Sequence, residues 1–215
     1  MSANTSRATA RDARVESTES TPVAVLGTLA EFHHEPIPYD LSALVRLVGE
    51  CNPELLCLDL TPDQWRHRDF EDLPPEYRDA LLPLAEQTDI VVVPVAGDWP
   101  PAEPAAIGWR GTCIGILRHC LILLQRGAPN PEAISEGPRH LGADLLYGAI
   151  TWLAGRDARR AWCSHTEKIV DRVHEVARRD PGSRVLVAVN VRHCHHVRRA
   201  LRKRPAINVA SVRDL

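Results

Sequence analysis

Histidine and carboxylate side chains gather at four places in the chain, each at the end of a short apolar run or shortly after one. They are Glu31, His33 and His34 after the first run, Asp59 at the end of the second, Asp98 after the third, and His193, His195 and His196 after the fourth. Imidazoles and carboxylates are the usual ligands of catalytic zinc, manganese or iron, where an open coordination position activates water. The sequence therefore predicts metal-assisted hydrolysis if these side chains meet in space.

The four apolar runs, Val23–Leu26, Glu54–Leu60, Ile90–Val95 and Arg184–Val189, are predicted to be strands. Between the first two, apolar residues recur at helical spacing from Asp40, a typical N-cap. A helix of this length suits the crossover between parallel strands. Ligands of an open parallel sheet bind beyond the carboxyl ends of its strands, so the four places are expected to meet at one edge.

The rest of the chain predicts more helices than strands. We expect helices at 61–65, 74–84, 113–125, 138–154, 159–179 and 196–204, and an edge strand at 207–212. The run Ile90–Val95 is apolar on both faces, which predicts a strand covered by helices on both sides. Residues 1–21 carry few large apolar side chains and are expected to be a disordered tail. The predicted fold is thus a single α/β domain over residues 22–215, with a mainly parallel sheet flanked by helices and a helical middle section.

Composition limits the partners that the chain can have. Among 215 residues, 26 basic side chains oppose 28 acidic ones, so no overall field favours a nucleic acid or a membrane, and neither is expected as a partner. The six cysteines are scattered, which predicts free thiols in a reducing, cytoplasmic compartment. The motifs for nucleotide hydrolysis, dinucleotide binding and serine hydrolysis are missing, and the oligomeric state stays open.

Three segments resemble the superfamily of TraB, PrgY and Tiki proteins, which includes the ChaN and erythromycin-esterase-like branches. They are Val25–Leu29, Asn52–Asp59 and Val189–His193, within a match that spans about residues 25–200. In that family the corresponding strands end in Gly-Thr-x-His, Pro-Asp-x-x-x-x-Glu and Gly-x-Gly-His. The resemblance implies an α/β fold whose strand-end histidines and carboxylates serve metal-dependent hydrolysis or, in the ChaN branch, haem binding.

The chain departs from the family at several motif positions. Ala30 stands in place of the first histidine, and Glu31 and His33 lie just beyond it as substitutes. Asp59 replaces the family glutamate, which keeps the charge but shortens its reach by one methylene. The rebuilt first motif leaves the family's site incomplete unless these neighbours complete it.

The late motif departs as well. Asn190 and Arg192 replace both glycines, while His193 keeps the imidazole. Where relatives carry an arginine anchor, this chain has His165. Two interpretations remain open, a divergent branch with a rebuilt site and a member that has lost catalysis.

Two functional hypotheses follow for a small-molecule or peptide substrate or ligand. In the first, a metal ion is held by His33, Asp59 and His193, with Glu31 beside it to take a proton from bound water and His195 as a second ligand or proton shuttle. In the second, the chain binds without turnover, holding haem through His193, His195 or Cys194, or an anionic ligand against Arg139 and Arg192. The basic stretch 192–204 is expected to be a solvated helix face.

Overall fold

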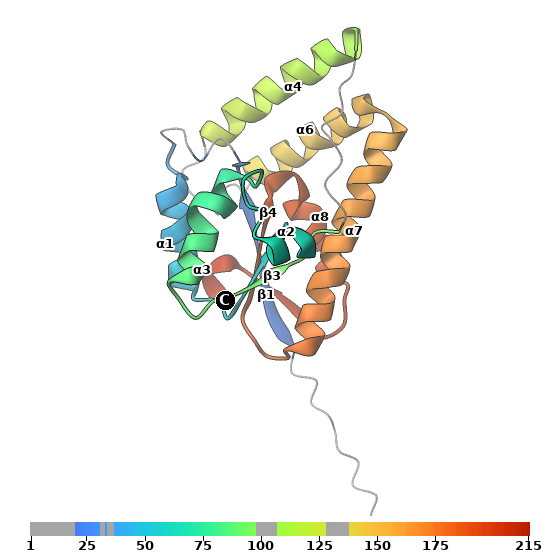
Figure 1. Cartoon of the computed structure of the whole chain (residues 1–215). Helices are drawn as coiled ribbons and strands as arrows, with labels where there is room; N and C mark the ends of the chain where they lie inside the picture. The colour runs from blue at the N-terminus through green and yellow to red at the C-terminus, as the bar shows by residue number, and fades with distance from the viewer. Residues whose placement is uncertain (1–19, 31–32, 34–36, 98–106, 128–137) are drawn as a thin grey trace, which may run out of the picture.

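The structure, a computed structural model, describes residues 20–30, 33, 37–97, 107–127 and 138–215 (Figure 1). Its described residues contain one five-stranded sheet in the order β3-β2-β4-β1-β5, and every neighbouring pair is parallel. The strands are β1 (Thr21–Thr28), β2 (Leu55–Leu58), β3 (Val91–Pro94), β4 (Val185–Asn190) and β5 (Ile207–Ala210). The predicted α/β class with a parallel sheet is confirmed.

Helices account for most of the other described residues. They are α1 (Leu41–Cys51), α2 (Pro62–His67), α3 (Leu82–Glu86), α4 (Trp109–Arg126), α6 (Pro138–Ala154), α7 (Arg156–Arg179) and α8 (Val191–Leu201). A π-helical segment, η2 (Glu76–Leu81), precedes α3, and a 3₁₀ turn, η3 (Val212–Asp214), ends the chain. The expected helix at 138–154 is confirmed. The expectation that the last helix begins at 196 is wrong, because α8 begins at Val191, directly after β4.

Strand β4 occupies the centre of the sheet although it comes late in the sequence. It pairs with β1 on one side and with β2 on the other, so that Val185 lies opposite both Val23 and Leu55. The opening β1-α1-β2 unit therefore contains two parallel strands, as predicted, but they are not neighbours. As a result, the carboxyl ends of β1, β4 and β2 lie side by side.

Local signals in the sequence fix the ends of the first helices. The Asp40 side chain accepts a hydrogen bond from the amide of Ala43 and caps α1, and Asn52 ends it in a left-handed conformation. Thr61 and Gln64 form a reciprocal capping box at the start of α2. These caps place α2 immediately beyond the end of β2.

Helices cover both faces of the sheet. One face packs Ala24, Leu26, Leu56, Leu58, Leu186 and Ala188 against α1, η2 and α3. The opposite face packs Val23, Val25, Cys57, Val185, Val187 and Val189 against α7 and α8. Figure 1 shows α1 and α3 on one side of the sheet and α7 on the other. The strict alternation of these strand residues between the two clusters follows from the period of two in a β-strand.

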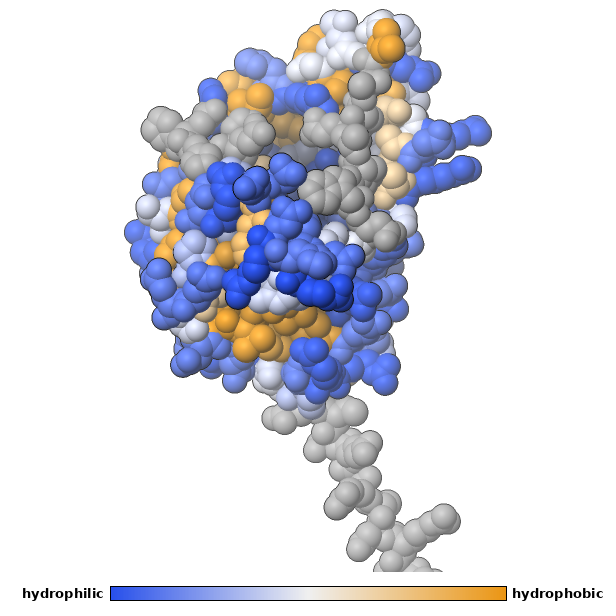
Figure 2. Space-filling view, viewed as in Figure 1, coloured by the Kyte–Doolittle hydropathy of each residue, from blue (hydrophilic) through white to orange (hydrophobic). Residues whose placement is uncertain are grey.

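Strand β3 differs from the prediction for it. It lies at the edge of the sheet and is partly exposed, with Val91 54% accessible. Figure 2 shows an apolar area in the part of the molecule where Figure 1 places β3. The expectation of full cover on both faces is therefore wrong, because strand order, which the apolar run does not encode, decides whether a strand is central.

The helical middle section forms a layer of its own. Ile114 and Leu121 of α4 share a small apolar cluster with Ala143 and Ile150 of α6. Within the described residues, no helix combines the length and apolarity needed to cross a bilayer. Thr21, which the sequence assigned to the tail, is the first residue of β1, and the remainder of the predicted tail up to residue 19 lies outside the described residues.

Substitution of Leu186 tests the central position of β4. Leu186 is fully buried in the middle of the sheet, so Leu186→Ala is expected to lower the free energy of unfolding by about 2–5 kcal/mol. The matched control Val91→Ala, on the exposed edge strand, is expected to cost under about 1 kcal/mol. Urea unfolding followed by circular dichroism measures both. Equal losses would contradict the strand order.

Candidate functional site

The candidate site lies at the carboxyl edge of the sheet, where β2 and β4 end and α7 crosses behind them. Asp59 directly follows β2. His193 lies in the first turn of α8, which begins without a loop because the Asn190 side chain accepts a hydrogen bond from the amide of Arg192. The inner face of α7 brings His165 and Thr166 to the same place. These four side chains come from three separate stretches of the sequence.

Asp59 and His165 form a hydrogen-bonded pair. The His165 Nε2 atom lies 3.0 Å from Asp59 Oδ2, and the two side chains are only 4% and 13% exposed. Because a carboxylate only accepts, Nε2–H of His165 donates, which leaves Nδ1 for other chemistry. The second oxygen, Asp59 Oδ1, is buried and has no hydrogen-bond partner among the described residues. The pair therefore presents an unused carboxylate oxygen.

Thr166 fixes the tautomer of His193. The Thr166 hydroxyl donates to the carbonyl of Trp162 at 2.8 Å, and the same oxygen lies 2.8 Å from His193 Nδ1. Since the hydroxyl has one hydrogen and already donates it, it accepts from Nδ1–H of His193. The neutral imidazole consequently keeps its lone pair on Nε2, where it can take a proton or bind a ligand.

Trp162 packs the two imidazoles of α8 in place. Its ring stacks on His193 at 5.4 Å between centroids and meets the ring of His196 edge-on at 4.5 Å. The ring of His165 meets His193 at 5.2 Å. His193 is therefore held by one hydrogen bond and two ring contacts, an arrangement that leaves its ring little rotational freedom.

Burial keeps His193 neutral. Its pKa lies well below the ordinary histidine value, chiefly because burial penalises the charged form and also because Arg192, His165 and His196 place positive charge beside it. Arg192 directly precedes His193 in α8, and its Nε atom is buried without a hydrogen-bond partner among the described residues. His193 is therefore neutral, and its Nε2 lone pair stays available to a ligand or to a proton in transit.

Two further buried polar residues come from the π-helical segment η2. Burial, reinforced by the charges of Asp59 and Glu76, raises the pKa of Tyr77 well above its ordinary value, and its hydroxyl donates to the carbonyl of Ala188 at 2.9 Å. Glu76 accepts a hydrogen bond from the amide of Ala30, which has a left-handed backbone. Isolated π-helical turns recur at functional sites. Here the segment ties the ends of β1 and β4 together.

A cavity of about 700 Å³ lies just beyond the ends of β2 and β3, and its lining begins at Thr61, two residues after Asp59. Thr61, Ala96, Gly97 and Lys168 are among the residues that line it. Lys168 lies three residues beyond His165 on α7, and a Cβ on Gly97 would fall 2.1 Å from Lys168 Cδ. The absence of a side chain at Gly97 therefore lets the lysine pack against the end of β3. The cavity has the volume of a small-molecule site.

His33, predicted as a metal ligand, forms hydrogen bonds to the backbone with both of its ring nitrogens. Its Nδ1 lies 2.9 Å from the carbonyl of Tyr39, and its Nε2 accepts from the amide of Leu29 at 2.9 Å. Both ring nitrogens are thus used, and the side chain is 2% exposed. The assignment of His33 to a metal is wrong for this conformation, because no nitrogen lone pair remains.

The other predicted site residues are dispersed. Glu31 lies outside the described residues. His195 and His196 of α8 face Asp144 of α6, at 4.0 Å and 3.2 Å. His193 and His195 do not share a face, as a continued strand would have required, because they lie two residues apart on a helix.

Two more predicted residues, Cys194 and Arg139, contact other parts of the chain. Cys194, a proposed haem ligand, is fully buried in the cluster between α8 and the sheet. Arg139, near the start of α6, lies against Gly127 at the C-terminal end of α4. Across the described ranges, no three histidine, cysteine, aspartate or glutamate side chains converge as a metal site requires. Of the predicted set, only Asp59 and His193 come together, with Arg192 beside them.

The site contains side chains of α7 that the sequence analysis did not assign to it, although their spacing gave a signal. Trp162, His165 and Thr166 are spaced at i, i+3 and i+4, and this spacing places them on one face of a helix. The roles of Glu76 and Tyr77 had no such signal, because their contacts join segments far apart in the chain. Comparison with family models, with curated proteins and with solved structures returned no significant match.

Replacement of His33 tests its structural role. His33→Ala leaves the buried amide of Leu29 without its acceptor and is expected to lower the free energy of unfolding by about 2–4 kcal/mol. The control His67→Ala, at an exposed position of α2, is expected to change it by less than about 0.5 kcal/mol. Urea unfolding measures both, and a neutral His33→Ala would refute the structural assignment.

The depressed pKa of His193 predicts acid-sensitive folding. The unfolded chain takes up a proton on this imidazole near pH 6.5, whereas the folded chain does not until a lower pH. Stability is therefore expected to fall as the pH drops below about 6.5, because the unfolded state binds more protons there.

Unfolding free energies measured between pH 5.5 and 8 test this expectation. His193→Asn removes the titrating ring and should flatten the pH dependence, whereas His67→Asn should leave it unchanged. His196, whose pKa is also lowered, chiefly by burial, should retain part of the slope. An identical slope in His193→Asn and in the unmodified chain would be the contrary result.

Proposed function

We propose that this chain is a hydrolase that acts through histidine acid–base chemistry at the carboxyl edge of its sheet. The single observation that carries the proposal is the array in which Asp59 holds His165 and Thr166 holds the neutral His193. A histidine with a fixed tautomer and a second one oriented by a carboxylate are the parts that general acid–base catalysis needs. Structural histidines also form such bonds, but two oriented imidazoles with their rings in contact exceed what packing alone requires.

The steps follow from the atoms that remain available. His193 Nε2 accepts a proton from water as the water adds to an ester or amide carbonyl. Arg192 lies beside His193 and stabilises the negative charge that develops on the carbonyl oxygen. Asp59 stabilises the imidazolium form of His165, in which Nδ1 carries a proton. His165 then gives that proton to the leaving group.

The substrate is a small molecule or a peptide that enters from the cavity of about 700 Å³ beyond the ends of β2 and β3. This volume suits a small molecule or a few residues of peptide. All six cysteines are free, which suits a reducing compartment such as the cytoplasm for this activity.

A metal-assisted form of the same reaction is favoured by one observation, the buried Asp59 Oδ1 without a hydrogen-bond partner among the described residues. Asp59 Oδ1 and His193 Nε2 are ligand atoms that suit zinc, manganese or iron. His33 cannot serve as a third ligand in this structure, because both of its ring nitrogens are hydrogen-bonded to the backbone. When bound, the ion would supply a Lewis acid for the carbonyl and a more acidic water. Thr166 would then orient the His193 ring as an outer partner.

Hydrolysis of a panel of nitrophenyl esters and amino-acyl nitroanilides tests the proposal. We expect turnover by the purified chain, and His193→Ala is expected to lower kcat/KM by about 10²–10⁴-fold, the range for loss of a general base. Assays after chelation and after addition of zinc, manganese or iron distinguish the metal-free reaction from the metal-assisted one. Metal analysis of the purified protein supports the same distinction.

Thr166 supplies the control for positioning. Thr166→Val should lower kcat with little change in KM, and Thr166→Ser should restore it, because only the hydroxyl orients His193. His67→Ala should leave the rate unchanged. Absence of turnover with and without metal, or an unaffected His193→Ala variant, would overturn the proposal.

A further inference from the structure

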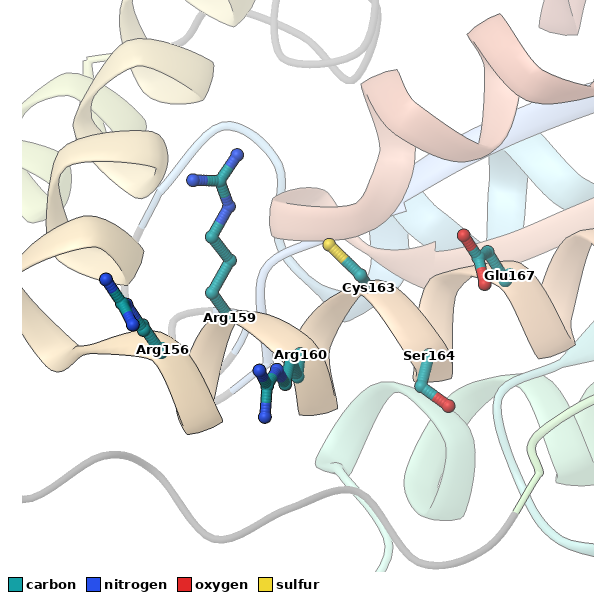
Figure 3. Close-up of a pocket in the computed structure, with 6 residues that line it drawn as sticks. All are labelled: Arg156, Arg159, Arg160, Cys163, Ser164 and Glu167. Carbon is teal, nitrogen blue, oxygen red and sulfur yellow. The ribbon is translucent and has the colours of Figure 1, made fainter.

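A second cavity, of about 340 Å³, opens on α7 between Arg156, about two and a half turns before His165, and Glu167, just beyond it. It is lined by Arg156, Arg159, Arg160, Cys163, Ser164 and Glu167. Among the described residues, three guanidinium groups and one carboxylate border the space. In Figure 3, Arg159, Cys163 and Glu167 point to one side of α7, and Arg160 and Ser164 point to the other.

The three arginines are poorly neutralised by the protein. Among the described residues, Arg160 pairs only with Asp157, at 3.9 Å, and both side chains of that pair are largely exposed. Arg156 and Arg159 make no ion pair with any residue in the described ranges. Exposed pairs such as Arg160–Asp157 contribute little. An anion in the cavity would neutralise part of this charge, and a guanidinium can give two parallel hydrogen bonds to a phosphate or carboxylate.

The position of the cavity relates it to the proposed active site. Arg159 precedes Thr166 by seven residues, or two helical turns, so both lie on the same side of α7 about 10 Å apart along its axis. Thr166 is the residue that holds His193, and Trp162, which stacks on His193, lies between the two positions. A substrate that reaches His193 can therefore extend an acidic group toward Arg159.

We propose that the cavity bordered by Arg156, Arg159 and Arg160 binds an anionic group, phosphate or carboxylate, on the substrate of this enzyme. The assignment of this anionic group to a substrate rests on the proposed function, whereas anion binding itself does not require turnover. It narrows the substrate class to a small molecule or peptide that carries a negative charge at a distance from the bond that is cleaved, since Arg159 and Thr166 are two helical turns apart.

Cys163 provides a built-in reporter, since its thiol lines the cavity and Cys120 is exposed elsewhere, on α4. The full chain is alkylated with the uncharged reagent N-ethylmaleimide, and the rate at each cysteine is followed by mass spectrometry. Inorganic phosphate and succinate are the probes, and sodium chloride at equal ionic strength is the control. We expect one or both probes to slow alkylation of Cys163 several-fold and to leave Cys120 unchanged.

Protection by phosphate alone assigns a phosphate ester, and protection by succinate alone assigns a carboxylate. Arg159→Gln should abolish the protection, whereas Arg178→Gln, an exposed arginine of the same helix outside the cavity, should retain it. Calorimetric titration of both probes into the same variants provides a second readout that does not depend on the thiol. Absence of binding by either method, or equal protection in Arg159→Gln, overturns the anion site even if the chain proves to be a hydrolase.

Discussion

The insertion of β4 between β1 and β2 is the constraint on which the rest of the structure depends. Every side chain of β4 from Val185 to Val189 is fully buried, so the strand cannot shift by one residue without exchanging its two faces. Its register with β1 and β2 sets where β4 ends, and α8 starts at the next residue. That junction carries His193 to the edge where Asp59 leaves β2. The site is therefore a consequence of strand order.

The cost of burial explains the hydrogen-bonding pattern around the site. A charged imidazole between helices would have to lose its hydration, which is why His193 is held neutral and why Thr166 satisfies its one N–H. His33 follows the same rule with a different result, because both of its nitrogens bond to the backbone. The difference between a structural and a chemically available histidine is thus one unused lone pair. Asp59 shows the same distinction, with one oxygen bonded to His165 and the other unpartnered among the described residues.

The sequence predicted the strands, most of the helices and the edge of the sheet at which polar residues gather, because these depend on local periodicity and caps. Asp59 and His193 were found through the rule that ligands bind at the carboxyl ends of parallel strands. His33 was misassigned because residue type and position do not reveal what a ring nitrogen contacts. The strand β4 runs into α8 without a loop, and the prediction missed the cap at Asn190 and placed the helix five residues late. The place of β4 between β1 and β2 joins residues more than 100 positions apart, and no local pattern encodes it.

Helix α7 links the two parts of the proposed activity. Its inner face supplies His165, Thr166 and Trp162 to the site, and its first turns carry the arginines of the second cavity. A rigid helix fixes the separation between positions on its surface, so the distance from an anionic group to the reacting bond is set by the helical rise rather than by loop conformation. The apolar residues Ile169, Val170 and Val173, further along the same helix, pack against the sheet and anchor it. Because one helix, packed on the core along its second half, carries both groups of residues, the proposed activity would select substrates by the distance between their anionic group and the bond that reacts.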